Sequence, residues 1–232
     1  YAAAQAGETI TLVAGSYTLP SSCTKAITIA GPNALIPADG TREEEAVISG
    51  ASVQFGSSIQ FVGVKLSGYN DQTNFTVVSS SNKDFTFKNC ILTKFNSVIR
   101  YDAEGIANGS VTFEGCKFDT IYQFLIKGDN ILNLSSILVK DCTFAANNGG
   151  VANSGAGLIR LNKAGATTVC TVVGCTFEGA LVSAENSFFR ATGGTFDIQY
   201  CAFNSVSKIV YASNSTAIVF NNNYYSESQS LA

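Results

Sequence analysis

Long polar side chains recur at one position of a short repeated segment, and most of them are cations. The segments are TVVSS (76–80), SVIRY (97–101), FLIKG (124–128), GLIRL (157–161), SFFRA (187–191) and KIVYA (208–212), with fourth residues Ser79, Arg100, Lys127, Arg160, Arg190 and Tyr211. In an extended strand the third residue, which is always apolar, would point inward and the fourth would point outward. The pattern therefore predicts a row of four outward cations, a chemistry suited to binding carboxylate or sulfate groups.

Carboxylates accompany only the first two of these cations. Asp102 follows Arg100 by two residues and Asp129 follows Lys127, whereas neutral residues follow the other two cations. Like charges on neighbouring strands repel each other, by about 1 kcal/mol per pair in water at about 5 Å. Two interpretations stay open: a solvated ladder of splayed and partly paired side chains, or a strip that binds an acidic polymer.

Cysteines recur at a fixed position of a second repeated segment. The five members of this series are Cys90, Cys116, Cys142, Cys175 and Cys201. Zinc sites favour short spacings such as Cys-x2-Cys, and the sequence contains none. Stacked neighbours with parallel Cβ vectors would form only strained disulfides. Since free cysteine behaves as a small buried hydrophobe, we interpret this series, together with Cys23 and Cys170, as core.

The cysteines belong to an eight-residue template with the form apolar-x-apolar-x-turn-small-x-large apolar. Its seven instances begin at Ile59, Phe85, Val111, Ile137, Cys170, Phe196 and Ala217. Gly, Asn or Asp stands at the turn position in six of the seven, and these residues tolerate positive φ. Two short strands therefore flank a tight bend. A repeat of 21–33 residues built from period-two strands predicts a solenoid of stacked β coils, with equivalent residues about 4.8 Å apart.

The expected fold is all-β: a single-stranded right-handed parallel β-helix of about eight coils with three short strands in each. We expect one domain over residues 1–232, with regular coils over residues 59–224. Residues 1–8 would be the remnant of a capping segment, the tail of a short helix that covers the open end of the solenoid.

Composition excludes several classes of function. Charged residues make up 13% of the chain and the net charge is −3, which gives no basis for binding nucleic acid. Histidine is absent, which excludes histidine-based acid–base catalysis and histidine metal ligands. No apolar run reaches membrane-spanning length. Because the chain begins at Tyr1, we expect that an upstream segment with a secretory signal has been removed.

Two N-terminal stretches carry a family resemblance. With the repeated Asn/Gly-Cys-x-Phe pattern, GETITLVAGSYTL (7–19) and ITIAGPNALIPADGTREEEAVISG (27–50) resemble the right-handed parallel β-helices of the pectate-lyase and chondroitinase-B-like superfamily. The second stretch is similar to uncharacterised secreted β-helix proteins of gut bacteria. The resemblance covers essentially the whole chain. It implies a secreted, periplasmic or cell-surface bacterial protein that binds or acts on an acidic polysaccharide.

The resemblance also implies a chemistry. Lyases of this kind neutralise a uronate carboxylate, often with Ca²⁺, and use a Lys or Arg to remove the proton at the sugar C5. The matching catalytic candidates are Lys127 and Arg100, and Asp102 and Asp129 are candidate calcium ligands. The substrate would contact the outward row, namely Arg100, Lys127, Arg160, Arg190 and Tyr211.

Two other functions are alternatives to lyase activity. A glycoside hydrolase would need paired acidic residues in one groove, and only Asp102 and Asp129 qualify. The alternative to a polysaccharide-active protein is a non-catalytic structural or adhesion module of the cell surface, in which the solenoid is a stiff spacer. No oligomeric state follows from these patterns.

Overall fold

The regular structure of the chain consists of parallel β-strands. The computed structural model describes residues 1–42, 44–69, 73–77, 82–101, 109–128, 134–145, 157–161, 168–178, 187–204, 209–212 and 216–226. Within these ranges every regular element is a strand, and none is a helix that could span a membrane. The predicted all-β class is confirmed.

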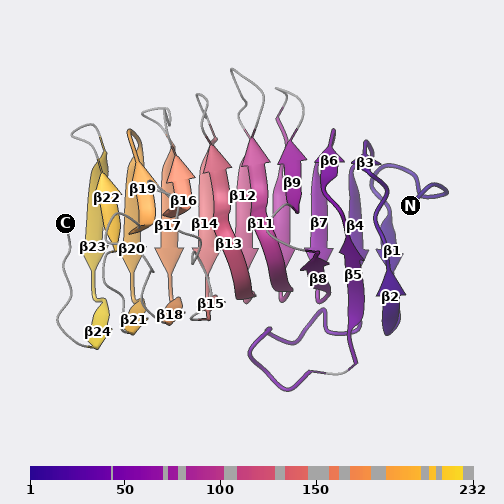
Figure 1. Ribbon diagram of the computed structural model, residues 1–232, viewed down its shortest axis with the longest axis horizontal. Coiled ribbons are helices and arrows are strands. Elements are labelled where there is room, and N and C mark those ends of the chain that lie inside the picture. The colour runs from indigo at the N-terminus through magenta and orange to yellow at the C-terminus, as the bar shows by residue number, and fades with distance from the viewer. Residues whose placement is uncertain are drawn as a thin grey trace.

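The first sheet gains one strand with each winding of the chain, and its strands lie side by side along the long axis of the molecule (Figure 1). Its nine strands, in spatial order, are β1 (Thr9–Thr11), β4 (Ile27–Ala30), β7 (Ile59–Val62), β10 (Phe85–Lys88), β12 (Ser110–Glu114), β14 (Ser136–Lys140), β17 (Val169–Val173), β20 (Thr195–Gln199) and β23 (Ala217–Asn221). Each strand pairs in parallel with the equivalent strand of the next coil. Nine such strands delimit eight windings, so the chain forms a parallel β-helix of about eight coils.

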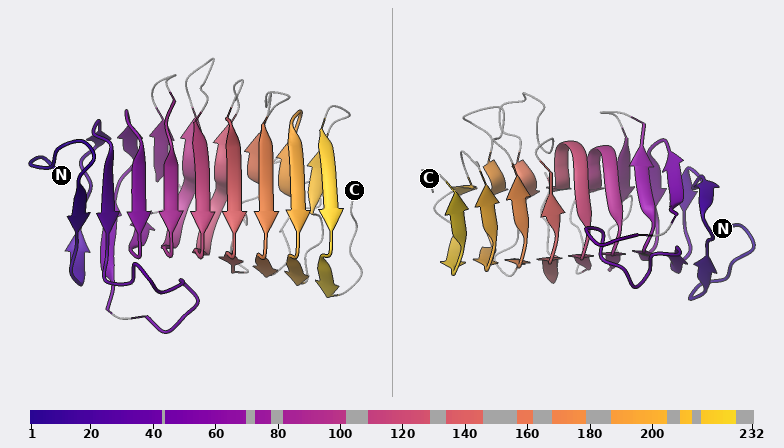
Figure 2. Two further views of the ribbon diagram at one scale, coloured as in Figure 1. Left: turned by 180° about the vertical axis from the view of Figure 1, so that it is seen from behind. Right: turned by 90° about the horizontal axis from the view of Figure 1, so that it is seen from below.

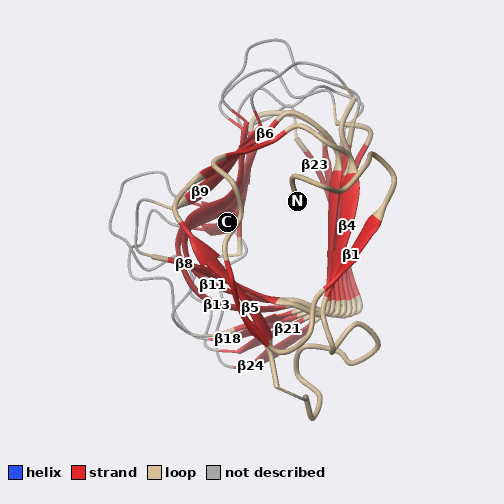
Figure 3. Ribbon diagram, turned by 90° about the vertical axis from the view of Figure 1, so that its right-hand side faces the viewer, coloured by secondary structure: helices blue, strands red, loops and turns tan. Residues whose placement is uncertain are grey.

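The second sheet has fifteen strands and wraps the other side of the coil in two rows (Figure 3). The first row is β2 (Gly15–Tyr17), β5 (Ala46–Gly50), β8 (Lys65–Gly68), β11 (Ile91–Tyr101), β13 (Lys117–Gly128), β15 (Thr143–Phe144), β18 (Thr176–Glu178), β21 (Ala202–Asn204) and β24 (Tyr224–Ser226). The second row includes β3 (Ser22–Cys23), β6 (Val53–Phe55), β9 (Asn74–Val77), β16 (Gly157–Leu161), β19 (Ser187–Ala191) and β22 (Val210–Ala212).

Strands β11 and β13 run through both rows, which differs from the expected three separate strands per coil (Figure 2). Each bends without a break, and the bends lie at Lys94 and Thr120, whose φ values are 61° and 59°. The other complete coils form three strands, as predicted.

A tight bend joins the first sheet to the second in each repeated coil. The residues at the template's turn position have positive φ: Gly63 (61°), Asn89 (53°), Gly115 (60°), Asp141 (51°), Gly174 (66°) and Tyr200 (53°). Both flanking strands can therefore face the same core. Tyr200 adopts this conformation although its side chain is 63% exposed and belongs to a type that disfavours it.

The loop that follows β4 packs against this column of bends and forms the excursion at the lower edge of Figure 1. The Asn89 side chain donates Nδ2 to the Ala34 carbonyl at 2.9 Å, and Arg42 Nη1 donates to the Asn89 carbonyl at 2.9 Å. At Gly63 the backbones come so close that an added Cβ would lie 2.2 Å from Ala34 N. Glycine is therefore required there for both space and positive φ.

The core consists of stacked columns, as the template predicts. In one column the rings of Phe61, Phe87 and Phe113 stack with centroids 5.5 and 4.8 Å apart. In the other column four rings stack, with successive centroids 4.6, 4.6 and 4.8 Å apart: Phe118, Phe144, Phe177 and Phe203. These rings are fully buried, and burial of such large apolar side chains is the main stabilising term of the coils.

The last unit is shifted by one residue from the predicted alignment. The pairing of β23 with β20 places Phe220 and Tyr225 in the core columns, where Val219 and Tyr224 were predicted. Both rings stack on Phe203, at 5.9 and 5.8 Å, whereas Val219 and Tyr224 are 40% and 64% exposed. Either register keeps an apolar alternation, and the observed one packs two aromatic rings, Phe220 and Tyr225, on Phe203.

The N-terminal residues form turns instead of the predicted helical tail. Tyr1 packs against the core, and its hydroxyl accepts hydrogen bonds from the Thr24 and Lys25 amides at 2.6 and 2.8 Å. Lys25 Nζ donates in turn to the Ala2 and Ala4 carbonyls at 2.8 and 2.7 Å. This segment is thus held against the first coil without a helix.

Candidate functional site

The four predicted cations lie beside one another on successive parallel strands. Arg100 of β11 pairs with Lys127 of β13, and Lys127 pairs with Arg160 of β16. Arg160 pairs with Arg190 of β19, which is followed by Tyr211 of β22. One cation per coil therefore recurs at the strand spacing of about 4.8 Å. We refer to Arg100, Lys127, Arg160 and Arg190 as the cation ladder.

Packing of the preceding residues turns the ladder outward. The residues immediately before the cations are at most 1% exposed: Ile99, Ile126, Ile159 and Phe189. The position before these is buried as well, and in β19 both Phe188 and Phe189 contact the Phe177 ring, at 4.9 and 5.8 Å. Two consecutive residues of each strand are therefore buried, and the next residue, the cation, is partly exposed.

On the N-terminal side of the ladder the predicted alignment is wrong. Arg100 pairs with Thr76 of β9, three residues before the predicted Ser79, and the register irregularity near Ser97 accounts for one of these three residues. Phe75 is therefore the inward residue of this coil, and its ring lies 4.9 Å from that of Phe95. The irregularity lets an aromatic ring fill the corner. Ser79 lies outside the described residues.

An aromatic ring helps to hold two neighbouring ladder cations. Lys127 Nζ lies 5.5 Å from the Phe124 ring centroid, and the Arg160 guanidinium carbon lies 5.6 Å from the same centroid. Cation–π contacts of this kind contribute about 0.5–1 kcal/mol each at exposed sites, comparable with the repulsion between one pair of like charges in water. Each of the four ladder cations also makes further contacts within the protein.

Three of the predicted site groups lie outside the described part of the structure. These are Asp102 and Asp129, the candidate calcium ligands, and the side chain of Tyr211. Among the described residues, no group of three or more His, Cys, Asp or Glu side chains could hold a metal ion. The structural case for the site therefore depends on the four cations.

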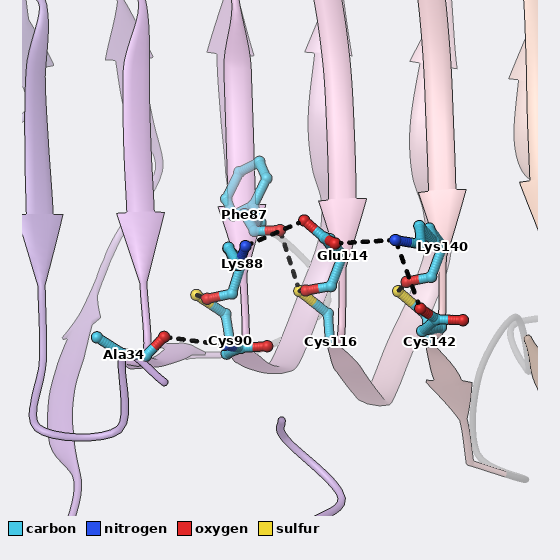
Figure 4. Close-up of polar contacts among 10 residues, drawn as sticks. Ala34, Phe87, Lys88, Cys90, Glu114, Cys116, Lys140 and Cys142 are labelled. Atoms are coloured by element: carbon cyan, nitrogen blue, oxygen red, sulfur yellow. Dashed lines mark hydrogen bonds and ion pairs between the residues drawn. The ribbon is translucent and has the colours of Figure 1, made fainter. Parts of the chain in front are cut away.

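The cysteine series forms a buried column, as predicted, and belongs to the core (Figure 4). Backbone bonds stack its members: Lys117 N donates to the Cys90 carbonyl and Thr143 N to the Cys116 carbonyl, both at 2.9 Å. The thiols donate to backbone carbonyls; for example, Cys90 Sγ lies 3.2 Å from Lys88 O. Burial raises the pKa of the Cys90 thiol well above its ordinary value, so this thiol is protonated and inert.

A second charged row, not singled out in the sequence, crosses the outer face of the first sheet (Figure 4). Glu114 lies between Lys88 and Lys140, with its carboxylate oxygens 3.4 and 3.2 Å from the two ammonium groups. The hydrogen bond from Lys140 is the main cause of a lowered pKa at Glu114. All three residues occupy the fourth position of the eight-residue template, so the sequence alignment could have revealed this row. Its charges alternate along the axis, whereas those of the ladder have one sign.

Comparison with models of known protein families and with curated proteins gave no match. The architecture is a parallel β-solenoid with a stacked aromatic and cysteine interior, and no family is assigned to it.

Proposed function

We propose that this protein is secreted or displayed at the cell surface and binds an acidic polysaccharide along the cation ladder. The observation that carries this proposal is the register of Arg100, Lys127, Arg160 and Arg190 on four successive coils. Like charges at this spacing repel each other, and a bound polyanion removes that repulsion. Three of the four are arginines, whose planar guanidinium groups donate two parallel hydrogen bonds to a carboxylate.

The geometry favours a polymer over a single small anion. Four cations separated by three strand spacings form a row about 14 Å long. A single carboxylate or sulfate would neutralise only one or two of them. A chain of linked anionic sugars presents repeated charges that can meet the whole row at once, and the β-sheet keeps the donors at fixed spacing.

A lyase step at the same site is a second candidate, and the position of Lys127 favours it. Lys127 is the one amine among the four ladder residues, and an amine is a better candidate base than a guanidinium group. It would take the proton from C5 of a uronate, the C–H electrons would form the C4=C5 double bond, and the oxygen on C4 would leave and acquire a proton. Arg100 and Arg160, its neighbours, would stabilise the developing charge on the carboxylate.

Titration calorimetry with polygalacturonate, alginate, chondroitin sulfate and heparin, each with and without Ca²⁺, tests the binding proposal. We expect the double variant Arg100→Ala/Arg160→Ala to weaken binding of the preferred polymer by about 100-fold or more. The matched control is Lys88→Ala/Lys140→Ala, which removes two cations from the opposite sheet and should leave affinity within about threefold. Equal losses in both variants would mean that net charge, and not the ladder, determines binding.

The absorbance of unsaturated uronate products, followed in the same mixtures, tests the lyase step. Lys127→Arg keeps the charge of the ladder but cannot act as a base, so it should bind polymer while losing any product formation. Binding without products in the wild type would identify a non-catalytic binding module. If none of the four polymers binds, the ladder proposal is wrong and the alternative, a structural or adhesion module, stands.

A further inference from the structure

A second polar site lies on the outer face of the first sheet, away from the cation ladder. It is a pocket of ≈ 260 Å³ that crosses the beginnings of β4, β7 and β10. Its polar lining consists of one carboxylate, one carboxamide and three hydroxyls: Asp84, Gln60, Thr28, Ser58 and Thr86. No ladder residue is among those that line it.

The carboxylate of this pocket is held in one orientation. Asp84 Oδ1 accepts hydrogen bonds from the amide and the hydroxyl of Ser110, at 2.9 and 2.7 Å. The Asp84 amide donates to Ser58 Oγ at 2.9 Å. Among the described residues, no hydrogen bond to the second carboxylate oxygen, Oδ2, is found. The bonds from Ser110 therefore fix the side chain, the bond to Ser58 holds the Asp84 backbone, and Oδ2 is left as an acceptor.

The carboxamide is oriented as well. Thr28 Oγ1 donates to Gln60 Oε1 at 3.3 Å, so that the Gln60 Nε2 group is directed away from this bond as a donor. The pocket thus offers a charged acceptor, an amide donor and hydroxyls that can act either way. Each of these side chains is at least partly exposed and can be reached from solvent.

We infer that this pocket binds one neutral sugar unit through adjacent hydroxyl groups. A fixed carboxylate accepts charge-assisted hydrogen bonds from two neighbouring hydroxyls, while Gln60 Nε2 donates to a ring or hydroxyl oxygen. The volume is below the range of about 300–1,000 Å³ typical of drug-sized ligands, which suits a single ring. Asp84 repels uronates, so the ligand differs in charge from the polymer proposed for the ladder, and the inference stands independently of that proposal.

Saturation-transfer NMR and calorimetry with D-galactose, D-glucose, L-arabinose and L-rhamnose, beside D-galacturonate, test this inference on the whole chain. At least one neutral sugar should bind, and D-galacturonate should bind about tenfold more weakly than that sugar. Asp84→Asn should lower the affinity for the neutral sugar by about tenfold. The matched control is Asp197→Asn, which removes a carboxylate from the same face but outside the pocket and should change nothing.

Asp84 also bonds to Ser110, so a second variant separates binding from folding. Gln60→Ala removes the amide donor and leaves the contacts of Asp84 in place. It should lower the affinity for the same sugar and leave the thermal midpoint unchanged. The inference is overturned if no neutral sugar of the panel binds, if D-galacturonate binds as tightly as the best neutral sugar, or if both variants bind like the wild type. None of these outcomes depends on the ladder.

Discussion

At the scale of single residues, backbone geometry decides which substitutions the bends accept. Gly63 and Gly174 occupy the same position of different coils, with φ values of 61° and 66°. A Cβ on Gly63 would meet the backbone of the loop after β4, at Asn33 and Ala34. A Cβ on Gly174 would meet a side-chain oxygen of Asp141, which can move. Although the two glycines have the same backbone conformation, replacing them by alanine should therefore destabilise the fold by different amounts.

We expect Gly63→Ala to lower the free energy of unfolding by about 2 kcal/mol or more, because strain at positive φ adds to a backbone clash. Gly174→Ala, the control, should cost only about 1 kcal/mol, the part due to φ. Thermal unfolding followed by circular dichroism measures both. Equal losses would show that the loop after β4 does not constrain Gly63.

The Glu114 row gives a pH dependence whose sign follows from the lowered pKa of this carboxyl. Its contribution to stability is present above the unfolded value of about 4.3 and is lost as the pH falls through the lower folded value. Glu114→Gln should therefore lower the thermal midpoint slightly at pH 7, by about 2 °C or less for a partly exposed pair. The difference between the wild type and the variant should shrink as the pH falls below about 4; a constant difference would contradict the assignment.

At the scale of the elements, the repeat made most of the fold predictable. The template places a turn residue and a core residue at fixed positions, so the stacked phenylalanines, the cysteine column and the ladder register could be derived by alignment. Irregular positions could not. Lys94 and Thr120 have positive φ without belonging to the residue types that favour it, so the continuous bends of β11 and β13 had no sequence signal.

The two register errors have one physical cause. Where the alternation of apolar residues fits more than one register, the sequence does not fix which residues pair. The packing of aromatic rings then determines the register. Phe220 and Tyr225 decide the register of β23, and Phe75 decides that of β9. The outward cations were predictable because they recur, whereas the pocket around Asp84 joins residues of different template positions and depends on bonds between coils.

The cysteine column makes a prediction about reactivity. All seven cysteines are free and buried, and burial raises the pKa of Cys23, for example, to about 11. We expect Ellman's reagent at pH 8 to leave the native protein unlabelled and to titrate all seven thiols after denaturation in guanidinium chloride. Rapid labelling of two or more thiols in the native protein would contradict the packed column.

Reversing one charge of the cation ladder should stabilise the fold and weaken polymer binding. Lys127→Glu converts two repulsive neighbours, with Arg100 and Arg160, into attractive ones. We expect the thermal midpoint to rise by about 2–4 °C, a net gain of about 1 kcal/mol, because the contacts that Lys127 loses, including the one with the Phe124 ring, offset most of the new attraction. Affinity for the acidic polymer should fall by about 100-fold, because a negative charge interrupts the row. A variant that is less stable and still binds would mean that Lys127 has only a structural role.

At the scale of the whole molecule, the solenoid places equivalent residues of successive repeats next to one another in space. Each winding adds one strand to the first sheet and one or two to the second, so residues about 26 positions apart become neighbours in a straight column. The stacked core holds these columns rigid, and a ligand with its own repeat can match them. This correspondence between coil spacing and ligand charge is the basis of the proposed function.

The most direct test is a crystal structure of the protein with an oligosaccharide of linked uronates. We predict that the sugar chain follows the solenoid axis, with successive carboxylates against the cations of β11, β13, β16 and β19. An oligosaccharide bound elsewhere, with none of the four ladder side chains in contact with it, would contradict the account.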